Sequence, residues 1–137
     1  LKLLFNNRNA SIINDLNAER LNVMGSYQDL VNVVVNILEN SIKYSKDIPL
    51  INVSTYNDEK HIFLKISDKG MGMNNNVKEK IFDKFYRETK GNIHNVKGHG
   101  LGLSYVKKII DLHFGTINVD SKLGEGSTFL IKFPLNI

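Results

Sequence analysis

Two carboxamides and an ammonium group fall on one face of a helix that the sequence predicts over residues 26–44. Apolar residues recur there at helical spacing, Ser26 is placed to cap the helix, and Asn36, Asn40 and Lys43 stand at i, i+4 and i+7. A carboxamide oxygen can supply the one protein ligand that a largely hydrated Mg²⁺ accepts, while a Lys meets phosphate oxygens. The trio therefore fits a polyphosphate site, but it also fits a solvated helix face, and these residues alone do not decide between the two.

A carboxylate ends a predicted strand directly before a Gly-rich turn. Asp68 follows an alternating apolar run and precedes Gly70-Met71-Gly72, where missing side chains let a flat ligand approach the backbone. A carboxylate in this place can accept a hydrogen bond from an exocyclic amine. An Asp followed by Gly is also a common turn former, so the spacing by itself leaves both interpretations open.

A second Gly-rich stretch leads straight into a predicted helix. Residues 97–104 read Lys-Gly-His-Gly-Leu-Gly-Leu-Ser, so free backbone N–H groups and the positive end of the helix dipole converge where an anion can sit. The spacing departs from the dinucleotide-binding fingerprint and from the P-loop pattern. We therefore expect an anion site without either of those folds.

Helices and hairpins must hold these residues in position. The helix over 26–44 is predicted to be long and amphipathic, because seven positions recur at helical spacing, Tyr27, Leu30, Val31, Val34, Ile37, Leu38 and Ser41. Period-two runs predict a hairpin of strands 51–55 and 62–66 around a polar turn, and two final strands at 117–119 and 129–133. Two further helices are predicted over residues 77–84 and 101–113, the latter with Leu103, Val106, Ile109 and Ile110 inward.

The remaining segments are less regular. Residues 1–8 are predicted to finish a helix begun upstream, and residues 11–16 and 21–24 to form short strands. Residues 88–100 hold three glycines and no periodicity, which is typical of a functional lid. Because helices alternate with hairpins, the sequence predicts an α+β fold of two layers, with helices on one face of a mainly antiparallel sheet.

Composition limits the class of protein. The 137 residues fit one domain, 42% are hydrophobic, and no apolar run approaches the ~20 residues that span a bilayer. The absence of cysteine fits a cytosolic compartment. The net charge of +4 has no basic stripe with interleaved aromatic residues, so we expect a polyphosphate rather than a nucleic acid as partner. The chain begins with Leu1 rather than Met, and we expect it to be part of a longer protein.

Five stretches together resemble the catalytic ATP-binding domain of bacterial sensor histidine kinases. Residues 36–45 resemble the N box of that family, 68–72 its G1 box, 82–87 its F box, 98–102 its G2 box and 124–128 its G3 box. The motifs stand in the family's order over roughly residues 20–133. The resemblance implies the Bergerat fold, an α/β sandwich shared with gyrase, Hsp90 and MutL.

The resemblance also implies roles for individual residues. Asn40 would hold Mg²⁺ through its side-chain oxygen, Tyr44 would pack on the adenine, and Asp68 would accept the adenine amino hydrogen with help from Thr128. The residues implied in catalysis are Arg87, Asn36 and Lys43, with Arg87 neutralising the transferring group. The other residues implied in nucleotide binding are Gly70, Gly72, Met73, Phe85, Lys97, Gly98, His99, Gly100, Leu101, Gly102 and Leu103.

The type of residue at position 36 favours a kinase over a hydrolase. ATP-hydrolysing branches of the wider fold resemble one another in having a Glu there that activates water, whereas Asn36 has no useful basicity. The resemblance implies transfer of the γ-phosphoryl group to a histidine, as a protein-histidine kinase does. The alternative is a degenerate module that binds nucleotide without phosphotransfer.

None of the four histidines looks like the phosphoacceptor, because the family's acceptor is followed by an acidic residue. The residues after His61, His94, His99 and His113 are Ile, Asn, Gly and Phe. The resemblance therefore implies a dimerisation and phosphoacceptor domain upstream of residues 1–137, and a response regulator beyond it. We expect this domain alone to be a monomer without membrane contact, within a dimeric, membrane-bound kinase of two-component signal transduction whose catalytic part is cytoplasmic.

Overall fold

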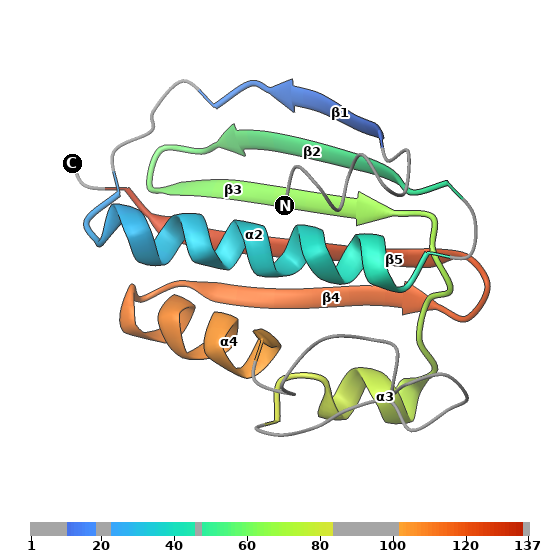
Figure 1. Ribbon diagram of the computed structural model, residues 1–137. Helices are drawn as coiled ribbons and strands as arrows, with labels where there is room; N and C mark the ends of the chain where they lie inside the picture. The colour runs from blue at the N-terminus through green and yellow to red at the C-terminus, as the bar shows by residue number, and fades with distance from the viewer. Residues whose placement is uncertain (1–10, 19–22, 46–47, 84–101, 136–137) are drawn as a thin grey trace.

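A five-stranded sheet with helices against one face forms the framework of the structure, a computed structural model that describes residues 11–18, 23–45, 48–83 and 102–135 (Figure 1). Its elements in chain order are β1 (Ser11–Leu16), α2 (Tyr27–Lys43), β2 (Leu50–Asn57), β3 (His61–Asp68), α3 (Asn75–Lys80), α4 (Gly102–Leu112), β4 (Thr116–Lys122) and β5 (Gly126–Pro134). The strand order is β1-β2-β3-β5-β4, with β1 parallel to β2 and the other neighbours antiparallel. The predicted α+β architecture with a mainly antiparallel sheet is confirmed.

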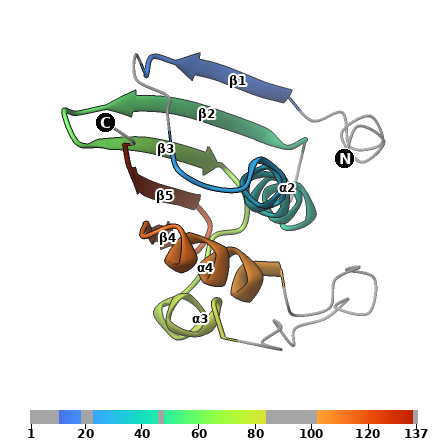
Figure 2. The same ribbon diagram turned by 90° about the vertical axis from the view of Figure 1, so that its left-hand side faces the viewer.

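Alternation along the strands separates the two faces of the sheet. In β5, Phe129, Ile131 and Phe133 are buried while the residues between them are only partly buried. Successive side chains of a strand point to opposite faces, so these three residues face the core. Figure 2 shows α2 and α4 on that side of the sheet, and no described helix covers the other side. The core therefore lies between the sheet and this helix pair.

Helix α2 follows the predicted bounds closely. The Ser26 hydroxyl accepts a hydrogen bond of 3.2 Å from the Asp29 N–H, which makes Ser26 the N-cap. The buried side of the helix consists of Val33, Ile37, Leu38, Ser41 and Ile42. Tyr27 was counted in the apolar stripe of the helix, but its side chain is 83% exposed. In helical projection Tyr27 does lie in the direction of the buried stripe, between Ser41 and Leu38. It is exposed because it is the first residue of α2, whereas the buried residues of the helix begin at Val33.

The predicted hairpin of β2 and β3 is confirmed, and element ends shift by a few residues elsewhere. Helix α3 begins at Asn75 rather than 77, because the Asn74 side chain caps it by accepting from the Val77 N–H at 2.9 Å. Val23 and Met24 were predicted to lie in a strand but do not. The predicted segments 1–8 and 88–100 lie outside the described residues. Within the described ranges, no helix is long and apolar enough to cross a membrane.

Candidate functional site

Asp68 lies at the end of β3 with its carboxylate turned toward the helix layer. Its Oδ1 accepts hydrogen bonds from the Gly70 N–H at 2.9 Å and from the Ser127 N–H at 3.3 Å. Burial raises the pKa of Asp68 above the ordinary value, and the two N–H donors and the nearby Ser41 hydroxyl oppose this rise. A buried carboxylate with one oxygen held by the backbone keeps its other oxygen for a ligand.

Three buried hydroxyl groups belong to the segments that pack around this carboxylate. Ser41 is 4% exposed, Ser121 5% and Ser127 8%, and they are the buried polar side chains of the described residues. The hydroxyls of Ser121 and Ser127 are 2.8 Å apart, and Ser121 also donates to the Gly126 carbonyl at 3.0 Å. The Ser41 hydroxyl faces Asp68 but makes no hydrogen bond of proper geometry within the described residues. Leaving a buried hydroxyl without a partner costs about 1–3 kcal/mol, so Ser41 fits a site that a polar ligand or a water completes.

The Gly-rich turn after Asp68 packs on the end of α2. A Cβ atom on Gly70 would stand 2.9 Å from the Tyr44 carbonyl oxygen, closer than Cβ atoms approach. The same carbonyl accepts the Met71 N–H at 3.1 Å. Tyr44 is the C-cap residue of α2, so these contacts place the last turn of the helix beside Asp68. Only glycine at position 70 allows this approach.

The turn between β4 and β5 packs on the other side of the same Gly-rich segment. Gly72 has a φ of +68°, and a Cβ on it would collide with the Lys122 carbonyl. Gly126 has a φ of +107°, and a Cβ there would collide with the Asp68 carbonyl. The Ser121 hydroxyl accepts from the Met73 N–H at 2.8 Å. The segments that resemble the G1 box (68–72) and the G3 box (124–128) therefore form one packed unit around Asp68.

Asn36, Asn40 and Lys43 form a polar row on α2, called here the carboxamide stripe, and its Asn36 end contacts the amino end of α4. The Asn36 side chain donates to the Asn32 carbonyl at 2.7 Å, which fixes its orientation. Its Oδ1 lies where a Cβ on Gly102, the first residue of α4, would be only 3.2 Å away. Within the described residues the Asn40 carboxamide has no hydrogen-bond partner, and Lys43 follows in the last turn of α2. Asn36 thus lies beside the positive end of another helix, and Asn40 and Lys43 follow it along α2.

Eleven of the predicted site residues lie within the described residues. The structure brings Tyr44, the C-cap of α2, next to the segment from Asp68 to Met73, which includes Gly70 and Gly72, and it brings Asn36 of α2 next to Gly102 of α4. Asn40 and Lys43 lie on α2 between Asn36 and Tyr44, and Leu103 follows Gly102 on α4. Seven predicted residues lie outside the described residues, Phe85, Arg87, Lys97, Gly98, His99, Gly100 and Leu101.

Thr128 is the one described residue that the structure moves away from Asp68. Its hydroxyl is 3.0 Å from that of Ser67, on the face of the sheet opposite to the helices. Ser127 pairs directly with Asp68 and faces the helices, so it occupies the place predicted for Thr128. The sequence contained the signal for this correction, because Ser127 is in phase with the core residue Phe129 and Thr128 is not.

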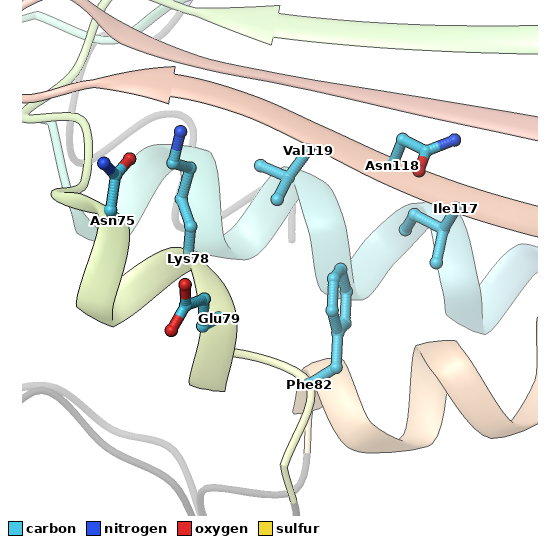
Figure 3. Close-up of a pocket in the computed structure, with 7 residues that line it drawn as sticks. All are labelled: Asn75, Lys78, Glu79, Phe82, Ile117, Asn118 and Val119. Atoms are coloured by element: carbon cyan, nitrogen blue, oxygen red, sulfur yellow. The ribbon is translucent and has the colours of Figure 1, made fainter.

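A hollow lies elsewhere, between α3 and the edge strand β4 (Figure 3). Its volume is about 420 Å³, and it is lined by Asn75, Lys78, Glu79, Phe82, Ile117, Asn118 and Val119. A second hollow of about 310 Å³ lies on the open face of the sheet near Thr128. Neither contains Asp68 or the carboxamide stripe, so both are separate from the packed unit described above.

The fold and the arrangement of Asp68, α2 and α4 define an ATPase-like α/β sandwich of the kind found in histidine kinases. A match to the family described as histidine kinase-, DNA gyrase B- and HSP90-like ATPases covers residues 25–137, and the chain belongs to this family. Three similar proteins, one curated relative and two solved structures, support this membership. The sensor protein RprX of Bacteroides fragilis is 41% identical over 129 residues, which are 93% of this chain and 25% of RprX.

Two solved structures have a backbone fold similar to that of this chain. The mycobacterial sensor histidine kinase MprB superposes with a TM-score of 0.78 at 27% identity, over 97% of this chain and 87% of the other. The catalytic domain of the histidine kinase ThkA superposes with a TM-score of 0.80 at 25% identity, over 97% and 85%. The chain is thus a histidine kinase-like ATPase domain, and it spans about a quarter of the length of RprX.

Proposed function

We propose that this chain binds Mg-ATP and transfers the γ-phosphoryl group to a histidine on a separate dimerisation and phosphoacceptor domain. The observation that carries the proposal is the coexistence of two half-sites on α2. One is the buried Asp68 carboxylate beside the unpartnered Ser41 hydroxyl, and the other is the Asn36 side chain beside the amino end of α4. A purine and a polyphosphate require these two chemistries.

The first half-site fits an adenine ring. The Asp68 oxygen that the backbone leaves available can accept a hydrogen bond from an exocyclic amine, and Ser41 can complete its hydrogen bonding through a water or a ring nitrogen. Gly70 and Gly72 keep side chains away from the adjoining backbone. These features support base recognition by Asp68, Ser41 and Ser127, with Ser127 replacing Thr128.

The second half-site fits phosphates and a magnesium ion. Helix α4 has 11 residues and offers its positive end at Gly102, where an anion is stabilised. Asn40 is the proposed Mg²⁺ ligand, because its carboxamide is not engaged by any described residue. When bound, Mg²⁺ supplies positive charge that neutralises the phosphates. Asn36 and Ser41 are five residues apart, so the two half-sites are separated by about 7.5 Å along α2, a distance that a nucleotide can bridge.

The chemistry of this proposal is transfer rather than hydrolysis. The Asn36 amide donates to a backbone carbonyl and has no basicity with which to activate water. A histidine acceptor brings its own nucleophilic nitrogen, and the chain needs only to hold the γ-phosphoryl group in line. His61 lies beside the hairpin turn and His113 at the far end of α4, away from Gly102. The acceptor is therefore proposed to come from another domain, and the downstream partner to be a response regulator.

The decisive experiment is transfer of radiolabelled phosphate from Mg-ATP to an added cognate phosphoacceptor domain. The unmodified chain should transfer phosphate, and Asn40→Ala should lose Mg-dependent ATP binding and transfer together, because the metal loses its protein ligand. Asn52→Ala is the matched control, since Asn52 is an exposed residue of β2 away from the helix layer. Binding without transfer would indicate the nucleotide-binding module instead. Unchanged Mg-ATP affinity in Asn40→Ala would remove Asn40 from the metal role.

A further inference from the structure

We propose that Tyr105 is a positioning residue that holds the amino end of α4 at the correct distance from α2 for phosphate binding. This inference rests on the proposed function, because it concerns the phosphate half of the same site. Its starting point is a polar stripe on α2 that is longer than the site requires. Asp29 and Asn32 continue the line of Asn36, Asn40 and Lys43 at spacings of three and four residues.

Tyr105 of α4 occupies the extended part of the stripe. Its hydroxyl accepts a hydrogen bond from the Asn32 side chain at 3.3 Å and donates one to the Asp29 carboxylate at 3.3 Å. The other end of the Asn32 carboxamide accepts from the Gln28 side chain at 3.0 Å. One phenol group therefore bridges two residues of the neighbouring helix, and both of its hydrogen bonds are with α2.

This bridge is directly connected to the phosphate half-site. Tyr105 follows Gly102 by three residues, which is less than one turn of α4. Across the helix pair, Asn32 precedes Asn36 by four residues and accepts the Asn36 side-chain hydrogen bond on its carbonyl at 2.7 Å. Two neighbouring contacts thus join the same two helices: Gly102 packs against Asn36, and Tyr105 bridges to Asn32 and Asp29.

A third contact fixes the opposite end of α4. The Ser26 N–H donates to His113 Nε2 at 3.1 Å, and His113 Nδ1 lies 2.7 Å from the Ile109 carbonyl. Gly25 is packed so closely on the His113 ring that a Cβ would collide with it. The His113 contacts hold only the carboxyl end of α4, so the position of its amino end depends on contacts nearer Gly102. The Tyr105 bridge is one of these contacts.

The hydroxyl of Tyr105 contributes to position more than to stability. The ring is partly buried and packs against the hydrophobic core, and this packing remains when only the oxygen is removed. The two hydrogen bonds are long and partly exposed, so their loss should change the folded stability little. A small displacement of α4 would nevertheless move N–H groups away from phosphate oxygens, to which their attraction is steep in distance.

The test compares a ligand with phosphates to one without. Tyr105→Phe should bind Mg-ATP about tenfold more weakly, while its affinity for adenosine, which reaches only the Asp68 half-site, should stay within about twofold. Mg-ATP is measured by isothermal titration calorimetry, and adenosine by amide chemical shifts. The melting temperature by circular dichroism should shift by no more than ~3 °C. Tyr56→Phe is the matched control, because Tyr56 stacks on Phe63 on the open face of the sheet.

A second pair of variants tests the bridge from the other helix. Asp29→Asn keeps an acceptor for the Tyr105 hydroxyl and should retain Mg-ATP affinity, whereas Asp29→Ala should lose it as Tyr105→Phe does. Equal Mg-ATP affinity in Tyr105→Phe and the unmodified chain would overturn the inference, as would an equal loss for adenosine or a collapse of the fold in Tyr105→Phe. If the unmodified chain did not bind Mg-ATP, the proposed function itself would fail, which separates the two results.

Discussion

The two ends of β3 carry aspartates with nearly the same local hydrogen bonding and opposite electrostatics. Asp58, in the turn before the strand, accepts from the Lys60 N–H at 2.8 Å and the His61 N–H at 2.6 Å. Asp68, at the end of the strand, accepts from the N–H two residues later in the same way. The pKa of Asp58 is lowered by its backbone hydrogen bonds, whereas the pKa of Asp68 is raised by burial.

The difference comes from what surrounds each carboxylate. Asp58 is exposed in a hairpin turn, and water solvates its charge. Asp68 lies under the end of α2, beside three buried serine hydroxyls. An Asp that forms a turn in contact with water has a local structural role. An Asp in a similar turn becomes a candidate binding group when tertiary packing excludes water and one carboxylate oxygen stays available.

The largest expected effect is on nucleotide binding at the buried end. Asp68→Asn should lower Mg-ATP affinity on the order of 100-fold, because the amide oxygen must serve the Gly70 and Ser127 N–H groups and the NH₂ cannot accept from an exocyclic amine. The same substitution at the exposed end, Asp58→Asn, should leave the affinity within about twofold. Isothermal titration calorimetry measures both. Comparable losses of Mg-ATP affinity in the two variants would contradict the assignment of Asp68, but not Asp58, to the nucleotide site.

A smaller effect is expected from the neighbours of Asp68 on β5. Ser127→Ala should weaken Mg-ATP binding by about fivefold, since it removes a hydroxyl from the buried cluster and one of the hydrogen-bond partners of Ser121. Thr128→Ala should have no measurable effect, because Thr128 bonds to Ser67 on the far face. If Thr128→Ala were the more damaging substitution, the assignment of the helix-facing side of β5 to the site would be wrong.

The smallest effect is on the pH dependence of folding, and its sign differs between the two ends. The pKa of Asp68 is raised in the folded state above its ordinary value of 3.8. Its favourable contribution to the free energy of unfolding is therefore fully present below pH 3.8 and is lost as the pH rises through the folded pKa. The free energy of unfolding of Asp68→Asn should therefore rise relative to that of the unmodified chain over this window.

At the other end of β3, the pKa of Asp58 is lowered below 3.8, so its contribution exists above 3.8 and is lost as pH falls through the folded pKa. Asp58→Asn should then lose stability relative to the unmodified chain as pH rises toward neutrality. Urea unfolding followed by circular dichroism from pH 3 to pH 7 measures both, since the chain has no Trp for fluorescence. Parallel pH curves for the two variants would contradict the assigned environments.

Most of the architecture could be predicted because it depends on local periodicity. The spacing of apolar residues marked α2 and α4 to within one or two residues, and the alternating runs marked the β2–β3 hairpin and the last two strands. Tyr27 is exposed although it lies in the direction of the buried stripe, because periodicity gives the direction of a side chain but not how far along the helix the core extends. Thr128 was misplaced because the family resemblance suggested a hydroxyl in that motif, while strand phase, which selects Ser127, was not applied.

By itself, the sequence determined which groups this protein has for its chemistry: the carboxamides and ammonium group of one helix, an aspartate before glycines, and a Gly-rich entry to a second helix. Only the tertiary structure decided which of them act together. Packing between segments distant in the chain buries Asp68 under Ser41, brings Gly102 to Asn36, and sets Tyr105 across Asp29 and Asn32. Burial and distance change the energy of a charge or a hydrogen bond, and neither is a property of local sequence.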